Sequence, residues 1–241
     1  MNKNLKIVAA SAGNSFFNRH LYFYNNSVKN PNKKKKGGGY GASADDHRIL
    51  DLIKANNLKA DSILEIGCST GIKLNEYRQI LSSKVNYGID LSSKAIISGR
   101  AKYKKIKLLK LSSLEIYKIK PQFDLIICGF FLYLLDREEI FNQFNLIYKK
   151  LRPNGYLIIE DYDPLFKHTN KSIHNKNLKS FKTSYNNFLE ESGLFKSIYK
   201  IRSNANSLAL RKHDKRFFKS EDIALSLYKK INFINSYPEN V

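Results

Sequence analysis

Cysteine is scarce in this chain, with two residues in 241, and no stretch approaches the 18 or more consecutive apolar residues of a membrane-spanning helix. Cys68 and Cys128 are too few for the disulfide framework of a small secreted domain. A reducing compartment is the default for such a chain. We therefore expect a cytoplasmic protein without a membrane partner.

Acidic residues are also scarce: 21 Asp and Glu stand against 42 Lys and Arg, giving a net charge of +21. Arginine is the minor cation, with 9 residues against 33 lysines, whereas nucleic-acid surfaces favour the bidentate arginine fork. The one lysine run, Lys33–Lys36, adjoins Gly37–Gly39 and is typical of a solvated loop. We expect no specific nucleic-acid partner, although this charge would attract an anionic small substrate. An RNA-binding or RNA-modifying protein is the alternative.

A length of 241 residues suits one α/β domain, and its organising stretch is residues 62–74. Ile63–Ile66 is a short apolar run of the kind found in buried parallel strands. Gly67 and Gly71 then mark a tight turn, after which apolar residues return at helical spacing. Strand, glycine turn and helix form the phosphate- or nucleotide-binding unit of doubly wound α/β folds.

A carboxylate follows at the distance that such a fold requires. Asp90 ends the next apolar segment, 19 residues after Gly71. In doubly wound folds the second strand lies beside the first, and an acid at its end binds ribose hydroxyls. Similar patterns predict strands at Ile106–Leu111, Phe123–Gly129, Tyr156–Ile159, Leu194–Ile201 and Asp222–Lys229. They predict helices at Asp45–Asn56, Asp136–Leu151 and about Ser184–Ser192, and one that Ser92 or Ser93 caps and that runs to about Tyr103.

Four segments in order resemble the motifs of class I S-adenosylmethionine-dependent methyltransferases: Ile63–Gly71, Gly88–Asp90, Phe123–Gly129 and Leu151–Glu160. The resemblance implies a doubly wound, mostly parallel seven-stranded sheet whose last strand is antiparallel. It also implies S-adenosylmethionine as the cofactor. Ser69 stands where that family often has a third glycine. The residues expected to bind the cofactor are Arg19, Glu65, Gly67, Cys68, Ser69, Gly71, Asp90, Leu91, Ser112 and Gly129.

Gly67–Gly71 also fits the G-x-S-x-G nucleophile elbow of α/β-hydrolases, with Ser69 as the nucleophile. Such an elbow follows several strands and needs an oxyanion loop. Upstream, only Leu5–Ala10 has the pattern of a strand, and Gly37–Gly39 is directly preceded by lysines rather than by a histidine. The hydrolase is therefore kept only as a remote alternative.

Residues 1–44 form an N-terminal extension to the methyltransferase-like domain of residues 45–241. Its aromatic residues recur at helical spacing around Arg19. They predict either a helix that packs on the domain or a lid over the cofactor, in which Arg19 would meet the methionine carboxylate.

Two polar stretches, residues 161–183 and 202–221, are expected to be substrate loops, because long loops at the functional edge of a sheet often bind substrate. Asp161 and Asp163 would lie at that edge, either as metal- or substrate-binding groups or as acceptors that fix the loop. No metal is expected. Phe131 and Tyr133 follow the fourth strand and are candidates for contact with the methyl acceptor, or core residues.

A narrower resemblance links the flanks to methyltransferases associated with pseudaminic acid and other surface-sugar biosynthesis. It rests on Gly13–Arg19, Asp161–Pro164, His174, Phe181 and Lys182 with Tyr185, and Asp222–Tyr228. It implies a small sugar or nucleotide-sugar acceptor, with Lys182 and Tyr185 as substrate-binding residues. His174 is the candidate base, oriented by Asp161 or Asp163, and its alternative is a surface histidine. The oligomeric state is left open.

Overall fold

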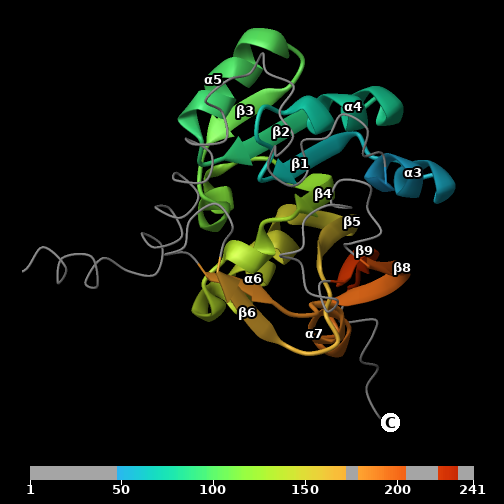
Figure 1. The fold of residues 1–241 in the computed structure, drawn as a ribbon. Helices are drawn as coiled ribbons and strands as arrows, with labels where there is room; N and C mark the ends of the chain where they lie inside the picture. Colours follow the sequence, from blue (N-terminus) through green and yellow to red (C-terminus); the bar gives the residue numbers. More distant parts are fainter. Residues whose placement is uncertain (1–47, 172–178, 205–221, 233–241) are drawn as a thin grey trace, which may run out of the picture.

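The computed structural model describes residues 48–171, 179–204 and 222–232, which Figure 1 draws in colour. The predictions for Arg19, His174, the extension of residues 1–44 and the segment 205–221 fall outside this part of the chain. Within it, no helix has the length and apolar character to cross a membrane.

A seven-stranded sheet forms the centre of the molecule, in the order β3-β2-β1-β4-β5-β9-β8. Its strands are β1 (Ser62–Ile66), β2 (Val85–Asp90), β3 (Lys107–Lys110), β4 (Phe123–Gly129), β5 (Leu151–Tyr162), β8 (Phe195–Asn204) and β9 (Asp222–Lys230). The first five strands pair in parallel, and β9 runs antiparallel to both β5 and β8. The predicted mostly parallel sheet with an antiparallel last strand is therefore confirmed.

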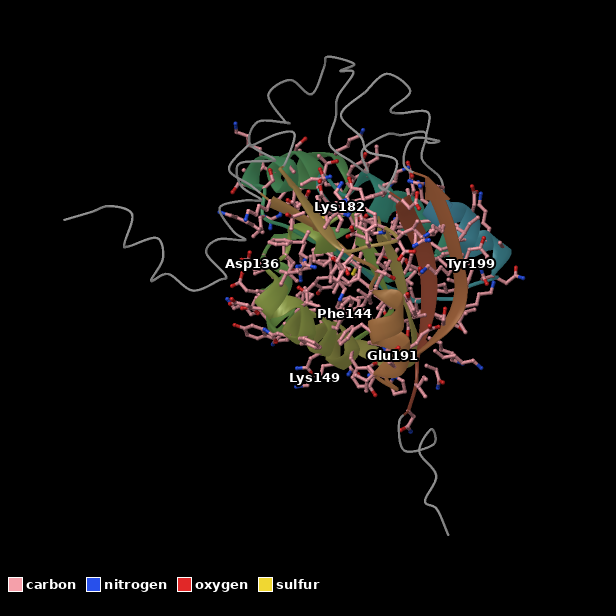
Figure 2. The ribbon with its side chains drawn as sticks, turned by 60° about the horizontal axis from the view of Figure 1, so that its bottom comes forward. Asp136, Phe144, Lys149, Lys182, Glu191 and Tyr199 are labelled. Carbon is pink, nitrogen blue, oxygen red and sulfur yellow. The ribbon has the colours of Figure 1, made fainter. Side chains whose placement is uncertain are left out.

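Helices cover both faces of this sheet (Figure 1). The helical elements are α3 (Arg48–Ala55), α4 (Ile72–Leu81), α5 (Ser93–Lys102), α6 (Ile140–Lys150) and α7 (Asn186–Glu191), with short 3₁₀ turns η1 (Ser113–Lys118), η2 (Leu132–Leu134) and η3 (Arg137–Glu139). One core cluster joins α3, α4 and α5 to one face, and a second joins η1, α6 and α7 to the other. α6 and α7 lie side by side, with the rings of Phe144 and Phe188 5.4 Å apart (Figure 2).

Burial on both faces explains why the central strands read as continuous apolar runs. Along β4, Leu125 and Ile127 enter one core cluster, whereas Ile126 and Cys128 enter the other. All four side chains are fully buried.

The chain after β4 differs from its prediction. The predicted helix Asp136–Leu151 begins with η3 and becomes α-helical only at Ile140. Leu151 belongs instead to β5, where it pairs with Phe123 before the register shifts. The strand is thus longer than the predicted Tyr156–Ile159, since the Pro-Asn-Gly sequence forms a bulge rather than a strand end.

The predicted loop over 161–183 is wrong in part, because β6 (His168–Lys171) and β7 (Lys179–Lys182) form an antiparallel hairpin. Its burial pattern explains the error. In β7 the inward side chains are Ser180 and Lys182, which hydropathy assigns to the surface.

Gly99 allows α5 to lie directly against the turn between β1 and α4. A Cβ at Gly99 would lie 2.2 Å from the carbonyl oxygen of Thr70 and 2.4 Å from a methyl carbon of Leu108. Because one of these neighbours is backbone, the turn itself would have to move.

We predict that Gly99→Ala lowers the free energy of unfolding by roughly 1–3 kcal/mol, as overpacking does. In a helix position with open space the same change would instead raise it by about 1 kcal/mol. Urea unfolding measures the difference, and Ser98→Ala, on the exposed face of α5, should stay within about 0.5 kcal/mol. A stabilised Gly99→Ala variant would show that α5 does not touch the turn.

Candidate functional site

The turn after β1 adopts left-handed backbone conformations at three positions. The φ angles are 79° at Gly67, 51° at Ser69 and 75° at Gly71. The backbone N–H groups of Gly67 and Cys68 donate to the carbonyl oxygen of Ile89, at 2.9 and 3.0 Å. The turn is therefore bound to the end of β2.

Asp90 completes this connection through its side chain. Its carboxylate is 3% exposed and accepts hydrogen bonds from the backbone N–H of Ser69 at 2.9 Å and of Ser92 at 2.8 Å. The first bond holds Ser69 in its left-handed conformation, and the second fixes the start of α5. A carboxylate offers about four acceptor positions, so these bonds are compatible with accepting ligand hydroxyls as well.

A narrow cavity lies beside this carboxylate at the carboxyl edge of the sheet. It is lined by Ile66, Gly67, Ile89, Asp90, Leu91, Leu111, Ser113 and Phe131. The structure thus brings together Gly67, Asp90 and Leu91, three of the predicted cofactor residues.

Ser112 lies next to this cavity but caps η1. Its hydroxyl accepts from Leu114 N at 3.3 Å, while Glu115 accepts from Ser112 N at 3.0 Å. Ser113 lines the cavity, and its buried hydroxyl has no hydrogen-bond partner among the described residues. The sequence Ser-Ser-Leu-Glu carries the capping-box signal, which could have identified Ser113 as the residue without a capping role.

Three other predicted cofactor residues, Glu65, Cys68 and Gly129, lie in different surroundings: two are buried, and the third adjoins open space. Burial raises the pKa of Glu65 from 4.5 to about 8, although a hydrogen bond with the Leu74 backbone opposes this. One Glu65 carboxylate oxygen has no hydrogen-bond partner among the described residues. Cys68 is buried, and its sulfur would lie 2.7 Å from a Cβ at Gly88, so it packs beneath the turn. A Cβ at Gly129 would meet no atom within 4 Å, which leaves the end of β4 accessible.

Asp161 fixes the segment that follows β4. It is 2% exposed and accepts from Leu132 N at 2.9 Å and from Tyr162 N at 2.7 Å. Burial raises its pKa from 3.8 to about 7, against the effect of these backbone hydrogen bonds. The same segment contains Phe130 at φ 50°, an uncommon conformation for an aromatic residue.

Asp163 is held by two cations of β8. It lies 2.8 Å from Lys200 Nζ and 3.0 Å from Arg202 Nε. Burial alone would raise its pKa, but the hydrogen bonds and charges of these partners lower it overall. The carboxylates of Asp161 and Asp163 are therefore both bonded to other parts of the fold. His174, the candidate base, lies outside the described residues. Within the described ranges, no cluster of three His, Cys, Asp or Glu side chains could hold a metal.

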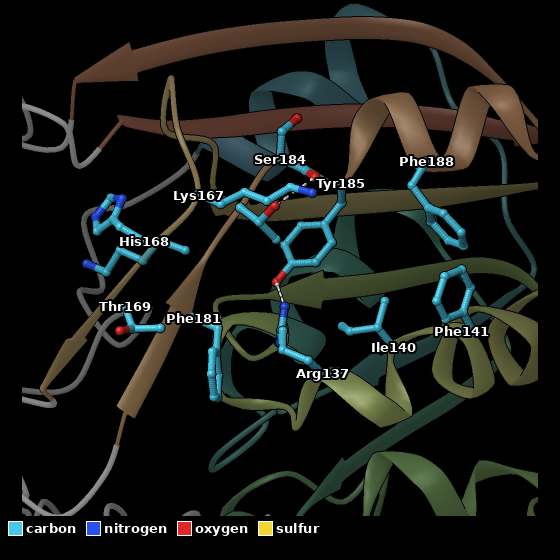
Figure 3. Close-up of a pocket in the computed structure, with 12 residues that line it drawn as sticks. Arg137, Ile140, Phe141, Lys167, His168, Thr169, Phe181, Ser184, Tyr185 and Phe188 are labelled. Carbon is cyan, nitrogen blue, oxygen red and sulfur yellow. Dashed lines mark hydrogen bonds between the residues drawn. The ribbon is translucent and has the colours of Figure 1, made fainter.

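A larger pocket of about 490 Å³ lies under the β6–β7 hairpin (Figure 3). It is lined by Arg137, Ile140, Phe141, Lys167, His168, Thr169, Phe181, Lys182, Thr183, Ser184, Tyr185 and Phe188. Arg137 donates to the Tyr185 hydroxyl at 3.1 Å and to the carbonyl oxygens of Leu132 and Leu135, and its guanidinium lies 5.0 Å from the Phe181 ring centre. Arg137 thereby connects the pocket to η2.

Lys182 and Tyr185, two of the predicted substrate residues, line this pocket. The Lys182 ammonium lies 3.7 Å from the ring centre of Tyr162, whose ring contacts Tyr133 at 5.1 Å. Tyr133 is thus buried behind the pocket wall. Phe131, also predicted for the substrate, lines the narrow cavity instead and lies against the glycine turn.

The family model described as "Methyltransferase domain" matches residues 57–219 of the chain. The chain belongs to this methyltransferase family. Its sheet is the Rossmann-like sheet of class I S-adenosylmethionine-dependent methyltransferases. The nucleophile-elbow reading of Ser69 is therefore not supported.

Two solved methyltransferases resemble the fold. The N-methyltransferase NodS from Bradyrhizobium japonicum WM9, in complex with S-adenosyl-L-homocysteine, has a TM-score of 0.62 at 14% identity over 90% of this chain and 98% of that one. The 1,6-didemethyltoxoflavin-N1-methyltransferase of Burkholderia thailandensis, with bound 1,6-didemethyltoxoflavin and S-adenosylhomocysteine, has a TM-score of 0.64 at 11% identity over 91% and 89%. At these identities the likeness concerns the fold.

One relative in Rickettsia prowazekii (strain Madrid E), the uncharacterised protein RP028, is 28% identical over 150 residues. The match covers 58% of this chain and spans 60% of the length of that relative.

Sequence reasoning missed most of the pocket of this methyltransferase. Arg137, His168 and the aromatic residues Phe141 and Phe188 line it without having been singled out as site residues. No local motif marks them, because they meet only when the hairpin folds over α6 and α7.

The pKa of Glu65 predicts the pH dependence of stability. Between pH 4.5 and about 8 the folded protein retains a proton on Glu65 that the unfolded chain has released. The free energy of unfolding should therefore fall as pH rises through this window, by up to about 1.4 kcal/mol per pH unit from this group. Glu65→Gln should flatten the slope in urea unfolding series, whereas Glu191→Gln, on an exposed residue of α7, should keep it. An unchanged slope in Glu65→Gln would mean that Glu65 ionises freely in the folded state.

Proposed function

We propose that the protein transfers the methyl group of S-adenosylmethionine to a small polar acceptor, a sugar or nucleotide sugar bound in the pocket under the hairpin. The observation that carries this proposal is the composition of that pocket, which combines cations with aromatic walls. The glycine turn and the segment after β4 support the cofactor half of the proposal.

The residues around the narrow cavity match the groups of S-adenosylmethionine in their chemistry, while the cavity itself measures about 10 Å³. Asp90 would accept the ribose hydroxyls, and the turn of Gly67, Ser69 and Gly71 would surround the methionine half. Ser113 takes the place of Ser112 as the residue facing the adenine, because its buried hydroxyl has no other partner among the described residues. Leu91 and Phe131 would supply apolar contact, and Gly129 leaves space at the end of β4.

Glu65 adds a further point of fit. Its buried carboxylate has an oxygen without a hydrogen-bond partner among the described residues. A cationic group near that oxygen would stabilise the ionised form. The methionine ammonium of the cofactor is such a group, and Arg19 would meet the methionine carboxylate.

The pocket favours an anionic or polyhydroxylated acceptor. Among the described residues that line it, three are the cations Arg137, Lys167 and Lys182, and none is acidic. Phosphate or carboxylate groups pair with such cations. The rings of Phe181 and Tyr185 offer faces to a sugar or a base. A nucleotide sugar carries all of these features, and the net charge of +21 would draw it to the protein.

For methyl transfer, the main task of the protein is to position the methyl acceptor against the methyl group of the cofactor. Bound S-adenosylmethionine supplies a methyl carbon already activated by the sulfonium. A hydroxyl acceptor also needs a site for its proton, and His174 is our proposed base. Asp161 and Asp163 would act through the segments they hold, Asp161 by fixing η2 and Asp163 by joining β5 to β8.

We predict that Asp90→Ala weakens binding of S-adenosylhomocysteine about tenfold or more, since a charge-assisted hydrogen bond contributes roughly 1.5–3 kcal/mol. Isothermal titration calorimetry on the full chain measures this. Asp90→Asn keeps one acceptor oxygen and should lose less. Asp61→Ala, an exposed acid at the opposite edge of the sheet, should bind normally. No binding by the wild type would contradict the cofactor assignment.

Labelled-methyl transfer tests the acceptor. A panel of UDP-N-acetylglucosamine, CMP-N-acetylneuraminic acid, free N-acetylneuraminic acid, small amines and RNA should give its highest kcat/KM with a sugar or nucleotide sugar. Amines belong in the panel because both similar structures described above are N-methyltransferases by name. RNA binding should vanish at physiological salt, since contacts to phosphates lose affinity steeply as salt rises. Nanomolar RNA affinity at that salt would favour the RNA alternative.

Lys182→Met should raise the KM for an anionic acceptor about tenfold, because it removes one buried charge that pairs with the anion. Its affinity for S-adenosylhomocysteine should not change. Lys179→Met is the matched control, since this exposed lysine of the same strand does not line the pocket. If both variants raise the KM equally, the effect comes from the overall charge of the protein and not from contact between Lys182 and the methyl acceptor.

A further inference from the structure

His168 lies at the start of β6, opposite Lys182 of β7. Its half-buried side chain lines the pocket under the hairpin, and its ring centre is 5.4 Å from that of Phe166. Figure 3 shows it at the opposite end of the pocket from Phe141 and Phe188. The pocket therefore has a polar end and an apolar end.

One ring nitrogen of His168 has a protein partner. Nδ1 lies 3.0 Å from the carbonyl oxygen of Phe166. A carbonyl oxygen only accepts hydrogen bonds, so Nδ1 must carry the proton. In the neutral ring Nε2 is then an acceptor with an available lone pair.

Nε2 of His168 is buried and has no hydrogen-bond partner among the described residues. Leaving a buried polar atom without a partner destabilises the folded protein, because the atom has lost its hydrogen bond to water. Such atoms are rare in folded proteins and often mark functional positions. A bound molecule that donates to Nε2 would remove this destabilisation.

The rest of the pocket is rich in donors. Arg137, Lys167 and Lys182 only donate, and none of the described lining residues is a carboxylate. The Tyr185 hydroxyl already accepts from Arg137. Among the described residues that line the pocket, His168 is the one with a buried side-chain atom that has no hydrogen-bond partner.

We infer that His168 Nε2 accepts a hydrogen bond from an O–H or N–H group of the methyl acceptor. This inference rests on the proposed function, because it takes the pocket as the acceptor site. The molecule that receives the methyl group would then have a hydrogen-bond donor at the polar end of the pocket. Its apolar or ring portion would lie toward Phe141 and Phe188. A molecule that lacks such a donor would leave Nε2 unpaired and bind less tightly.

The tautomer tests the inference without any acceptor. Two-bond ¹H–¹⁵N spectra of the full chain, labelled with ¹⁵N-histidine and assigned by comparison with His168→Gln, should show a proton on Nδ1 and none on Nε2 of His168. A proton on Nε2 would overturn the inference. This result does not depend on whether the protein transfers methyl groups.

The second measurement adds UDP-N-acetylglucosamine, CMP-N-acetylneuraminic acid or free N-acetylneuraminic acid, each with S-adenosylhomocysteine. At least one probe should move the Nε2 resonance of His168. A resonance that none of the three moves at millimolar concentration overturns the inference. Probe binding without methyl transfer would instead contradict the proposed function alone.

Variants then isolate the hydrogen bond. His168→Phe keeps a ring against Phe166 but has no acceptor, and should raise the Kd of the bound probe roughly tenfold. His168→Gln can place an oxygen near the position of Nε2 and should stay within about threefold. Leu165→Ala, an exposed residue outside the pocket lining, should bind as the wild type. Equal Kd values for His168→Phe and the wild type would overturn the inference.

Discussion

The arrangement of this molecule depends on the buried carboxylate of Asp90. Its two hydrogen bonds join the turn after β1, the end of β2 and the start of α5. Ser69 can keep a left-handed backbone because its N–H is bound there, although the family often has glycine at this position. α5 packs so closely on the turn that position 99 has no room for a Cβ. One side chain thus holds the glycine turn and its supporting helix in place.

The segment after β4 links this turn to the pocket under the hairpin. Phe131 lies against Gly67 and lines the narrow cavity. The next residue, Leu132, is held at its N–H by Asp161 and at its carbonyl by Arg137, which reaches in from the pocket. The same short stretch of chain therefore borders both the narrow cavity and the larger pocket, so that a displacement of η2 would change the two together.

The sequence was sufficient to predict the sheet, the glycine turn and Asp90. Parallel strands covered on both faces leave apolar runs, and the turn leaves glycines at fixed spacing, so both signals are local. The β6–β7 hairpin left no such signal, because the inward positions of β7 are Ser180 and Lys182. The structure adds that Ser112, the serine predicted to meet the cofactor, caps η1 in a capping box with Glu115. Arg137 and His168 both line the pocket although they are 31 residues apart in the chain, and no local sequence pattern predicts this.

The most direct test of the central claim is a crystal structure of the full chain with S-adenosylhomocysteine. The geometry around Asp90 predicts the ribose hydroxyls on its carboxylate, the adenine beside Leu91 and Ser113, and the sulfur on the side of η2 that faces the pocket. The ligand bound at another edge of the sheet, or bound here without contact to Asp90, would contradict the claim.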